Sequence, residues 1–260
     1  MSSTDTVLHQ QTAGIARITL NRPDALNALN ADLLHALAAL LDRIRDDETA
    51  EAVIVTGGGK AFCAGADIAY LRQASPLAVR EFARLGIAVN ERIETLGKPV
   101  IAAIDGYALG GGLELAEACW LRVAAKNARL DHPEVKIGAV AGFGGTTRLP
   151  RLVGRGRAAE LLLRGRTVTA AEALNIGLVH EVVEPDELLV AAEALARELM
   201  ARSPAAVRLT WEMLHRGSNL SLEESARLGA DHFGLVAASD DFRSGTQAFL
   251  DGRAQVYAGR

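Results

Sequence analysis

Aromatic residues, cysteines and positive charge are all scarce in this chain of 260 residues, and each scarcity excludes a class of protein. Aromatic residues make up 4% of the chain and the net charge is −4, whereas single-stranded nucleic acid is bound by aromatic platforms interleaved with basic residues. The most apolar stretch, residues 99–119, contains Asp105, Glu114, Glu117 and several glycines. It therefore falls short of the roughly 20 uninterrupted apolar residues of a membrane span. We expect neither nucleic acid nor a membrane as a partner.

The two cysteines, Cys63 and Cys119, are too few and too scattered for a disulfide framework or a metal site. The first residues, Met1 to Thr6, lack the basic and then apolar pattern of an export signal. Both observations favour a reducing cytoplasm, and we expect no bound metal.

Alternating strand-like and helix-like segments over the first 185 residues predict an α/β fold. Residues 7–11 and 14–20 predict a β-hairpin, and Asn30 precedes a helix that should end near Asp46. Two buried strands, at residues 52–56 and 99–104, enclose a helical region over about residues 76–96. A further helix through Cys119, a strand at residues 121–125, and then loops and short helices follow.

The last third of the chain changes character. The pattern predicts four helices: one from Pro185 to about residue 199, and others at residues 204–216, 222–238 and 240–250. Because these helices have no strands of their own to pack on, we expect them to cover the first domain or to face other subunits. The chain therefore divides into a core, residues 1–185, and a helical region, residues 186–260.

The glycine-rich run from Gly106 to Glu114 (GYALGGGLE) is the main candidate for chemistry. It lies between a predicted buried strand and a helix, where backbone N–H groups lack internal partners and the helix dipole favours negative charge. Glu114 lies three residues after Gly111, on the same helical face. A carboxylate at an anion site suggests N–H groups that stabilise an enolate oxygen while Glu114 handles a proton or a water. On these residues alone, close packing of strand on helix explains the glycines equally well.

Two further loops support the chemical interpretation. Residues 62–68 follow the first buried strand as the glycine-rich run follows the second, so adjacent parallel strands would bring both loops to one edge of the sheet. Residues 131–138 contribute a second carboxylate, Glu134. The dinucleotide fingerprint, the P-loop, the GxSxG elbow and the HExxH zinc motif are all missing.

Six segments of the chain, taken in their order, match the pattern of one known family. They are NRPDALNAL from Asn21, AFCAGADI from Ala61, KPVIAAIDGYALGGGLELA from Lys98, HPEVKIG from His132, GGTTRLPR from Gly144 and TAAEALNIGLVHEVV from Thr169. On these segments the chain resembles the enoyl-CoA hydratase/isomerase, or crotonase, superfamily over nearly its whole length. The resemblance implies a crotonase-like spiral of repeated β-β-α units and a helical C-terminal region that assembles homotrimers or homohexamers.

The resemblance also implies roles for individual residues. The backbone N–H groups of Ala66 and Gly111 would hold the thioester oxygen, and each such donor typically contributes a few kcal/mol when charge develops there. Glu114 would activate a water and Glu134 would protonate the α-carbon. A carboxyl that donates a proton near neutral pH needs a raised pKa, which burial can supply.

The substrate implied is an acyl-CoA, with coenzyme A as part of the substrate and no other cofactor. Its contacts would come from backbone near Ala25, with Arg22, Lys60 and Arg253 as weaker candidates for the phosphates. The full set of binding residues that the resemblance indicates is Ala25, Ala64, Ala66, Asp67, Ile68, Gly110, Gly111, Pro133 and Gly142.

Two glutamates indicate hydration of a 2-enoyl-CoA to a 3-hydroxyacyl-CoA. The alternatives are a double-bond isomerase, or other enolate chemistry on an acyl-CoA, and a CoA-binding or scaffold protein without activity. Retention of Glu114 and Glu134 disfavours both.

Several residues receive a plainer interpretation or depart from the family pattern. We expect Glu117 to be a structural or solvated charge, His132 to be a loop hydrogen-bonder and a modest candidate for tuning Glu134, and Cys63 to be a buried packing residue. Trp120 stands where the family often has aspartate, Asp131-His132 replaces a smaller pair, and Ala141 replaces a proline. The first change should affect packing, and the other two leave acyl chain length and branching open.

Overall fold

The computed structural model describes residues 5–257 and 259 of the chain. Met1 to Thr4, which belong to the stretch inspected for an export signal, lie outside the described residues. Within the described part, none of the helices has the length and apolar character needed to cross a membrane.

A six-stranded sheet forms the centre of the molecule. Its spatial order is β1-β2-β3-β5-β7-β10. The strands are β1 (Val7–Thr12), β2 (Ile15–Leu20), β3 (Ala52–Gly57), β5 (Val100–Ile104), β7 (Leu121–Ala125) and β10 (Glu181–Val183). Only β1 and β2 pair antiparallel, as the predicted hairpin requires, whereas the other neighbours run parallel. The parallel pairing of β3 with β5 confirms that their two loops leave the same edge.

A second sheet is built from the short strands that follow those of the first. Its order is β4-β6-β8-β9, with β4 (Ala61–Cys63), β6 (Tyr107–Leu109), β8 (Arg129–Asp131) and β9 (Val168–Thr169). Strands β4, β6 and β8 run parallel. The succession β3-β4, β5-β6 and β7-β8, each followed by helical segments, confirms the expected spiral of β-β-α units.

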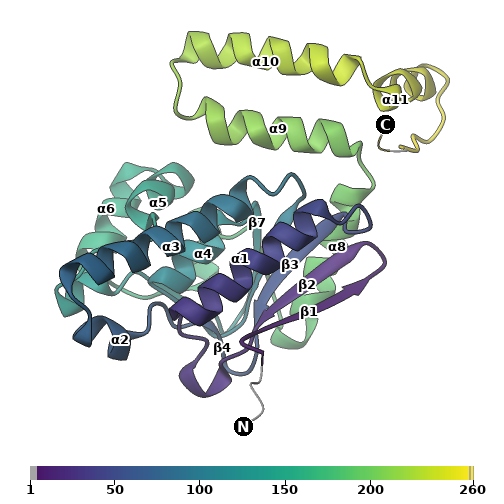
Figure 1. The fold of residues 1–260 in the computed structure, drawn as a ribbon. Helices are drawn as coiled ribbons and strands as arrows, with labels where there is room; N and C mark the ends of the chain where they lie inside the picture. Colours follow the sequence, from purple (N-terminus) through teal and green to yellow (C-terminus); the bar gives the residue numbers. More distant parts are fainter. Residues whose placement is uncertain (1–4, 258, 260) are drawn as a thin grey trace.

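The fully buried strands of the large sheet alternate between two apolar cores. On β3, Val53 and Val55 face one core and Ile54 faces the other. The first core takes in α1 (Ala31–Asp46), α3 (Pro76–Glu94) and α4 (Gly111–Ala118), and the second takes in α8 (Leu188–Met200). Figure 1 shows α1 and α3 on the near side of the sheet and α8 behind it.

The packing of α8 corrects one expectation. Leu188, Ala192 and Ala196 are buried against the sheet, in contact with β3, β5 and β7. The expectation that none of the C-terminal helices has strands to pack on is therefore wrong for α8. Its amphipathic pattern was visible in the sequence, but its partner was not, because the uncovered face of the sheet exists only after the strands assemble.

The remaining C-terminal helices stand away from the body, as Figure 1 shows for the α9–α10 hairpin. They are α9 (Pro204–Gly217), α10 (Leu222–Ala237) and α11 (Asp240–Leu250). Few of their residues are buried, namely Leu209, His232, Asp241 and Ala248. One attachment point is Trp211, which stacks on Trp120 with a centroid distance of 4.6 Å and donates a 2.7 Å hydrogen bond to the Glu94 carbonyl. Trp120, in place of the aspartate, thus serves packing as expected.

The shorter helical segments complete the frame around the site. They are η1 (Pro23–Ala25), α2 (Ile68–Gln73), η2 (Glu134–Ile137), α5 (Gly145–Val153), α6 (Arg155–Arg164), α7 (Ala170–Asn175) and η3 (Pro185–Glu187). The sequence pattern did not single out α2, whose six residues include none that is buried.

Candidate active site

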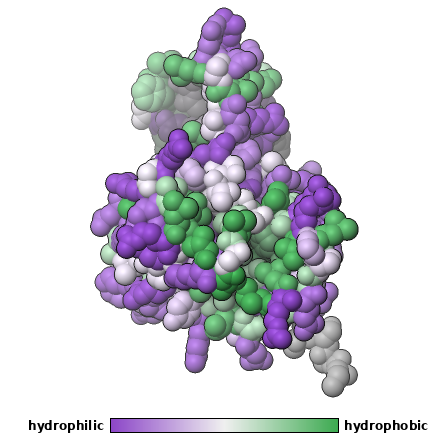
Figure 2. All heavy atoms as spheres, turned by 90° about the vertical axis from the view of Figure 1, so that its left-hand side faces the viewer, coloured by the Kyte–Doolittle hydropathy of each residue, from purple (hydrophilic) through white to green (hydrophobic). Residues whose placement is uncertain are grey.

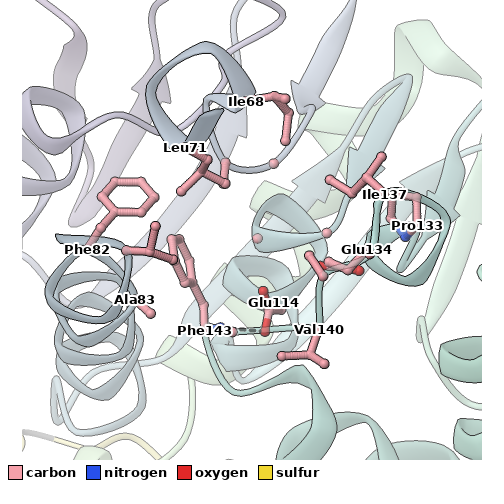
Figure 3. A pocket seen from close by; sticks show the side chains of 18 of the residues that line it. Ile68, Leu71, Phe82, Ala83, Glu114, Pro133, Glu134, Ile137, Val140 and Phe143 are labelled. Carbon is pink, nitrogen blue, oxygen red and sulfur yellow. Dashed lines mark hydrogen bonds between the residues drawn. The ribbon is translucent and has the colours of Figure 1, made fainter. Parts of the chain in front are cut away.

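A cavity of about 550 Å³ opens between α2 and α3 on one side and η2 on the other. Its walls are mostly apolar, and Figure 2 shows apolar side chains gathered around a hollow in this face. Its polar side chains include the two glutamates, Glu114 and Glu134. In Figure 3 both carboxylates face the cavity, with Ile68, Leu71 and Phe82 across from them.

Two backbone N–H groups at the wall of this cavity come from different elements. Leu29 donates to the Gly65 carbonyl and accepts from the Asp67 N–H, so in this parallel bridge the intervening Ala66 N–H points away from Leu29. Gly111 is the first residue of α4, where the N–H has no partner within the helix. Both residues line the cavity. The loops after β4 and β6 therefore converge as predicted.

The three consecutive glycines have different duties. Gly110 has φ +48°, and a Cβ there would lie 2.8 Å from the Glu134 Oε1. A Cβ on Gly112 would lie 2.3 Å from the Cys63 carbonyl oxygen, so this glycine lets α4 pack on β4. Close packing thus explains Gly112, while Gly111 presents its N–H to the cavity. The packing interpretation therefore holds for Gly112, and the chemical interpretation of Gly111 stays a prediction.

Glu114 is fixed by backbone hydrogen bonds. Its Oε1 accepts from the N–H groups of Phe143 and Gly145, at 2.8 and 2.7 Å. The residue is 1% exposed. Burial raises the pKa of Glu114 to about 7, even though the Gly145 N–H and the charge of His132 act in the opposite direction. A carboxyl with this pKa can both take and give a proton near neutral pH.

The loop that donates these hydrogen bonds to Glu114 is itself fixed by side chains of α3 and α5. The Phe143 carbonyl accepts from Asn90 Nδ2 at 3.0 Å and from Arg148 Nη1 at 2.8 Å. Arg148 also forms a two-pronged ion pair with Glu94, at 2.6 and 2.7 Å. Because α3 carries both Asn90 and Glu94, this helix fixes the position of the Glu114 oxygen through the loop.

Glu134 begins η2, after Pro133, and its environment is looser. Its side chain is 15% exposed. Within the described part of the chain its Oε2 is buried and has no hydrogen-bond partner. The nearest cationic group is the His132 ring, whose Nδ1 lies 3.9 Å from that oxygen.

Of the two expectations for Glu117, a structural or a solvated charge, the structure agrees with the first. The residue is 4% exposed, and its Oε1 lies 2.8 Å from Nε2 of the buried His132. Burial alone would lower the pKa of His132, but the carboxylates of Glu117 and Glu134 outweigh burial and raise it to about 10. Glu117 is therefore a structural charge with an imidazolium as its partner.

Most of the predicted binding residues line the cavity. These are Ala64, Ala66, Ile68, Gly110, Gly111, Pro133 and Gly142. Ala25 and Asp67 are not among the lining residues. Asp67 instead caps α2 and pairs with Arg22 at 3.3 Å, and Ala25 ends η1. A role of these two in binding stays a prediction.

The weaker predictions fare differently. Arg22 is engaged by Asp67 and Arg253 by Asp251, whereas Lys60 is exposed. Cys63 is fully buried, as expected, and burial raises the pKa of its thiol to about 12. Ala141 does not line the cavity, although its neighbours Val140 and Gly142 do.

Sequence reasoning missed one wall of the cavity. This wall is built from α2, α3, the end of η2 and the loop after η2, which supply Leu71, Pro76, Val79, Arg80, Phe82, Ala83, Ile137, Val140 and Phe143. The helical spacing of Val79, Phe82 and Ala83 was a usable signal, since it marks one face of α3. The backbone donors of Phe143 and Gly145 carry no such signal, because any residue has an N–H group.

Two backbone N–H groups and two carboxylates around one apolar cavity form a site that can stabilise negative charge on an oxygen and move a proton beside it. The chain belongs to the enoyl-CoA hydratase/isomerase family, whose model matches residues 10–260. This match confirms the resemblance carried by the six segments.

Individual relatives agree with this assignment. The chain is 43% identical to the crotonyl-CoA hydratase of Syntrophomonas wolfei over 96% of each chain. It is 42% identical to the short-chain-enoyl-CoA hydratase of Clostridium acetobutylicum over 95% of each chain. Among solved structures, an enoyl-CoA hydratase from Bacillus anthracis has a TM-score of 0.93 and 37% identity, covering 98% of this chain and all of that one.

Proposed function

We propose that the enzyme catalyses the reversible syn addition of water to the double bond of a 2-enoyl-CoA, which gives a 3-hydroxyacyl-CoA. The observation that carries this proposal is the pair Glu114 and Glu134, which line the same cavity as the Ala66 and Gly111 amides. The relatives named as crotonyl-CoA and short-chain-enoyl-CoA hydratases support the same reaction. Coenzyme A enters as part of the substrate, and the proposed reaction needs no other cofactor.

The proposed chemistry proceeds through an enolate. The thioester oxygen accepts hydrogen bonds from the Ala66 and Gly111 N–H groups. Glu114 takes a proton from water as the water oxygen bonds to the β-carbon, and the electron pair of the C=C bond moves toward the thioester oxygen. Glu134 then gives its proton to the α-carbon, and the thioester carbonyl forms again.

Proton bookkeeping defines the active form of this pair. Hydration starts with Glu114 ionised and Glu134 protonated, and it ends with these states exchanged. The reverse reaction starts where hydration ends. Both directions therefore need one proton on the two carboxyl groups together, and the pH dependence of kcat/KM reports the loss or gain of that single proton.

The helical region supports a proposal about assembly. Several large apolar residues of α10 and α11 are exposed in the single chain, namely Leu222, Phe233, Leu235, Phe249 and Leu250. Exposed patches of this kind mark contacts between proteins. We propose that they join subunits into homotrimers or homohexamers in the cytoplasm, and light scattering coupled to size-exclusion chromatography measures the mass directly.

The test of the reaction follows the absorbance of the conjugated enoyl thioester with crotonyl-CoA and with longer and aromatic enoyl-CoAs. We expect loss of absorbance with the wild type, and a decrease of kcat by about 10²- to 10⁴-fold in each of Glu114→Gln and Glu134→Gln. A wild type that is inactive on all of these substrates contradicts the hydratase. If only Glu134→Gln abolishes turnover and the product is a shifted alkene, the enzyme is an isomerase.

A further inference from the structure

Three buried polar atoms without hydrogen-bond partners lie on Glu134 of the proposed catalytic pair and on two side chains close to it. They are Oε2 of Glu117, Nδ1 of His132 and Oε2 of Glu134, judged among the residues that the structure describes. Buried polar atoms in proteins are nearly always bonded. The mechanism above uses Glu134 and leaves the other two side chains without a role.

The geometry places His132 between the two glutamates. Its Nε2 lies 2.8 Å from Oε1 of Glu117, and its Nδ1 lies 3.9 Å from Oε2 of Glu134. A separation of 3.9 Å is too long for a hydrogen bond and too short to admit a bridging water. A shift of roughly 1 Å would close it into a hydrogen bond. The other oxygen of Glu134, Oε1, lies beside Gly110 at the start of α4.

We propose that Glu117 and His132 are a positioning pair for Glu134. Glu117 fixes the imidazole ring, the ring donates from Nδ1 to Oε2 of Glu134, and Oε1 is thereby turned toward the α-carbon of the bound substrate. The proposal rests on the proposed function, because the orientation of Glu134 matters only if it delivers a proton.

Charge balance supports this arrangement. With one proton on the catalytic pair and Glu117 ionised, the pocket holds two negative charges, and an imidazolium at His132 offsets one of them. The pKa of His132, raised to about 10, keeps the ring charged at neutral pH. The charged groups that act on the ring or on its carboxylate neighbours come from several elements: Glu114 and Glu117 from α4, Asp131 from β8, Glu134 and Lys136 from η2, Arg122 from β7 and Arg148 from α5.

The first test removes the charge of Glu117 and keeps its shape. In Glu117→Gln the buried ring loses the carboxylate that holds its proton, so the catalytic pair loses a cationic neighbour. We expect kcat to fall about 10- to 100-fold, as for a misplaced catalytic group. We also expect the acid limb of the kcat/KM profile to move to higher pH, by about one unit.

A matched control separates charge from loosening of the same segment. Thr167 donates a 2.9 Å hydrogen bond to Oδ2 of Asp131, next to His132, and Thr167→Val breaks that bond without changing charge. Its pH profile should keep the position of the wild type's acid limb. An unmoved limb in Glu117→Gln, or an equal displacement in Thr167→Val, would overturn the positioning pair.

The second test separates the two ring nitrogens. An asparagine amide can occupy the place of Nδ1, next to Glu134, whereas a glutamine amide reaches the place of Nε2, next to Glu117. We expect His132→Asn to retain about tenfold more kcat than His132→Gln, with similar KM values, because only the former keeps a donor for Glu134. Equal kcat values, or the opposite order, would refute the assignment.

A spectroscopic readout keeps this inference distinguishable from the proposed function. In the ligand-free wild type, ¹⁵N NMR of the histidine rings, assigned with His132→Gln, should show both nitrogens of His132 protonated at pH 7. In Glu117→Gln the ring should be neutral at that pH. An active hydratase with a neutral His132 ring overturns the positioning pair alone, whereas a wild type without hydratase activity overturns the proposed function and the positioning role with it.

Discussion

The two walls that carry the glutamates differ in burial and in how they hold their carboxylates. Every residue of α4, including Glu114, is buried, whereas no residue of η2, which begins with Glu134, is buried. Glu114 accepts two backbone hydrogen bonds at one oxygen. The Oε2 of Glu134 instead lies 3.9 Å from Nδ1 of the His132 ring. Titratable pairs in unlike environments take unlike roles in proton transfer, so the difference suits a division of labour between water activation and protonation of the α-carbon.

An added methyl group should reduce activity most where it contacts the buried Glu114. A Cβ on Gly145 would lie 2.8 Å from Cε1 of His132 and 3.0 Å from Cγ of Glu114, and both side chains are enclosed. We expect Gly145→Ala to reduce kcat about 100-fold through displacement of Glu114. We also expect a loss of about 1–3 kcal/mol of unfolding free energy. Steady-state kinetics and urea denaturation measure the two effects.

The matched substitution beside the more loosely held Glu134 is Gly110→Ala. Its Cβ would meet Oε1 of Glu134 at 2.8 Å, the far end of a side chain with room to move, although the φ of +48° adds strain. We expect a smaller decrease of kcat, about tenfold, and therefore a smaller effect than in Gly145→Ala. If Gly110→Ala decreases kcat more than Gly145→Ala does, Glu134 is not the more loosely held of the two carboxylates.

The raised pKa of Glu114 links activity and stability in the same direction. Because the catalytic pair must keep one proton between its two carboxyl groups, kcat/KM for hydration should fall as pH rises through about 7, where that proton is lost. A folded-state pKa raised above the ordinary value of 4.5 contributes stability that is present below that value and is lost as pH rises through about 7. The wild type should therefore lose up to about 3 kcal/mol relative to Glu114→Gln between pH 5 and 8.

Denaturation of the wild type and Glu114→Gln at both pH values, at fixed protein concentration, measures this difference. A constant difference between the two proteins would show that burial does not raise the pKa of Glu114. The activity limb at about pH 7 would then need another titrating group.

We expect the smallest effect on kcat for a substitution in α9, which acts on the loop around Glu114 only indirectly. Trp211→Phe keeps the stacking on Trp120 but removes the hydrogen bond to the Glu94 carbonyl. We expect a loss of about 1 kcal/mol in unfolding free energy and a change in kcat of less than about threefold. A large loss of kcat would mean that α9 helps to position Glu114, through Glu94, Arg148 and Phe143, in addition to stabilising the fold.

Much of the frame follows from local pattern. Asn30 accepts a hydrogen bond from Leu33 N–H and caps α1, whose buried leucines have the predicted spacing. The β-branched run of β3 is fully buried and parallel to β5, as a strand without polar alternation requires. The four candidate site residues, Ala66, Gly111, Glu114 and Glu134, also follow from the sequence, because the order of its motifs indicates the family.

Other features could not follow from the sequence. Nothing in the local pattern of α8 tells that its partner is the far face of the sheet, because that face is assembled from strands distant in sequence. Nor does the spacing of Glu117 and His132, 15 residues apart, predict an ion pair. Each residue has an adequate local interpretation by itself. The ion pair forms only because the fold brings α4 and the segment after β8 together.

The sequence by itself determined most of the longer elements, the family and the four groups proposed for chemistry, because periodicity, capping and motif order are local properties of the chain. The tertiary structure decided how those groups differ. Burial of α4 raises the pKa of Glu114 to about 7, and the packing of β8 beside α4 puts a charged His132 between Glu117 and Glu134. Desolvation and charge proximity depend on distances across the fold, and no stretch of sequence contains them.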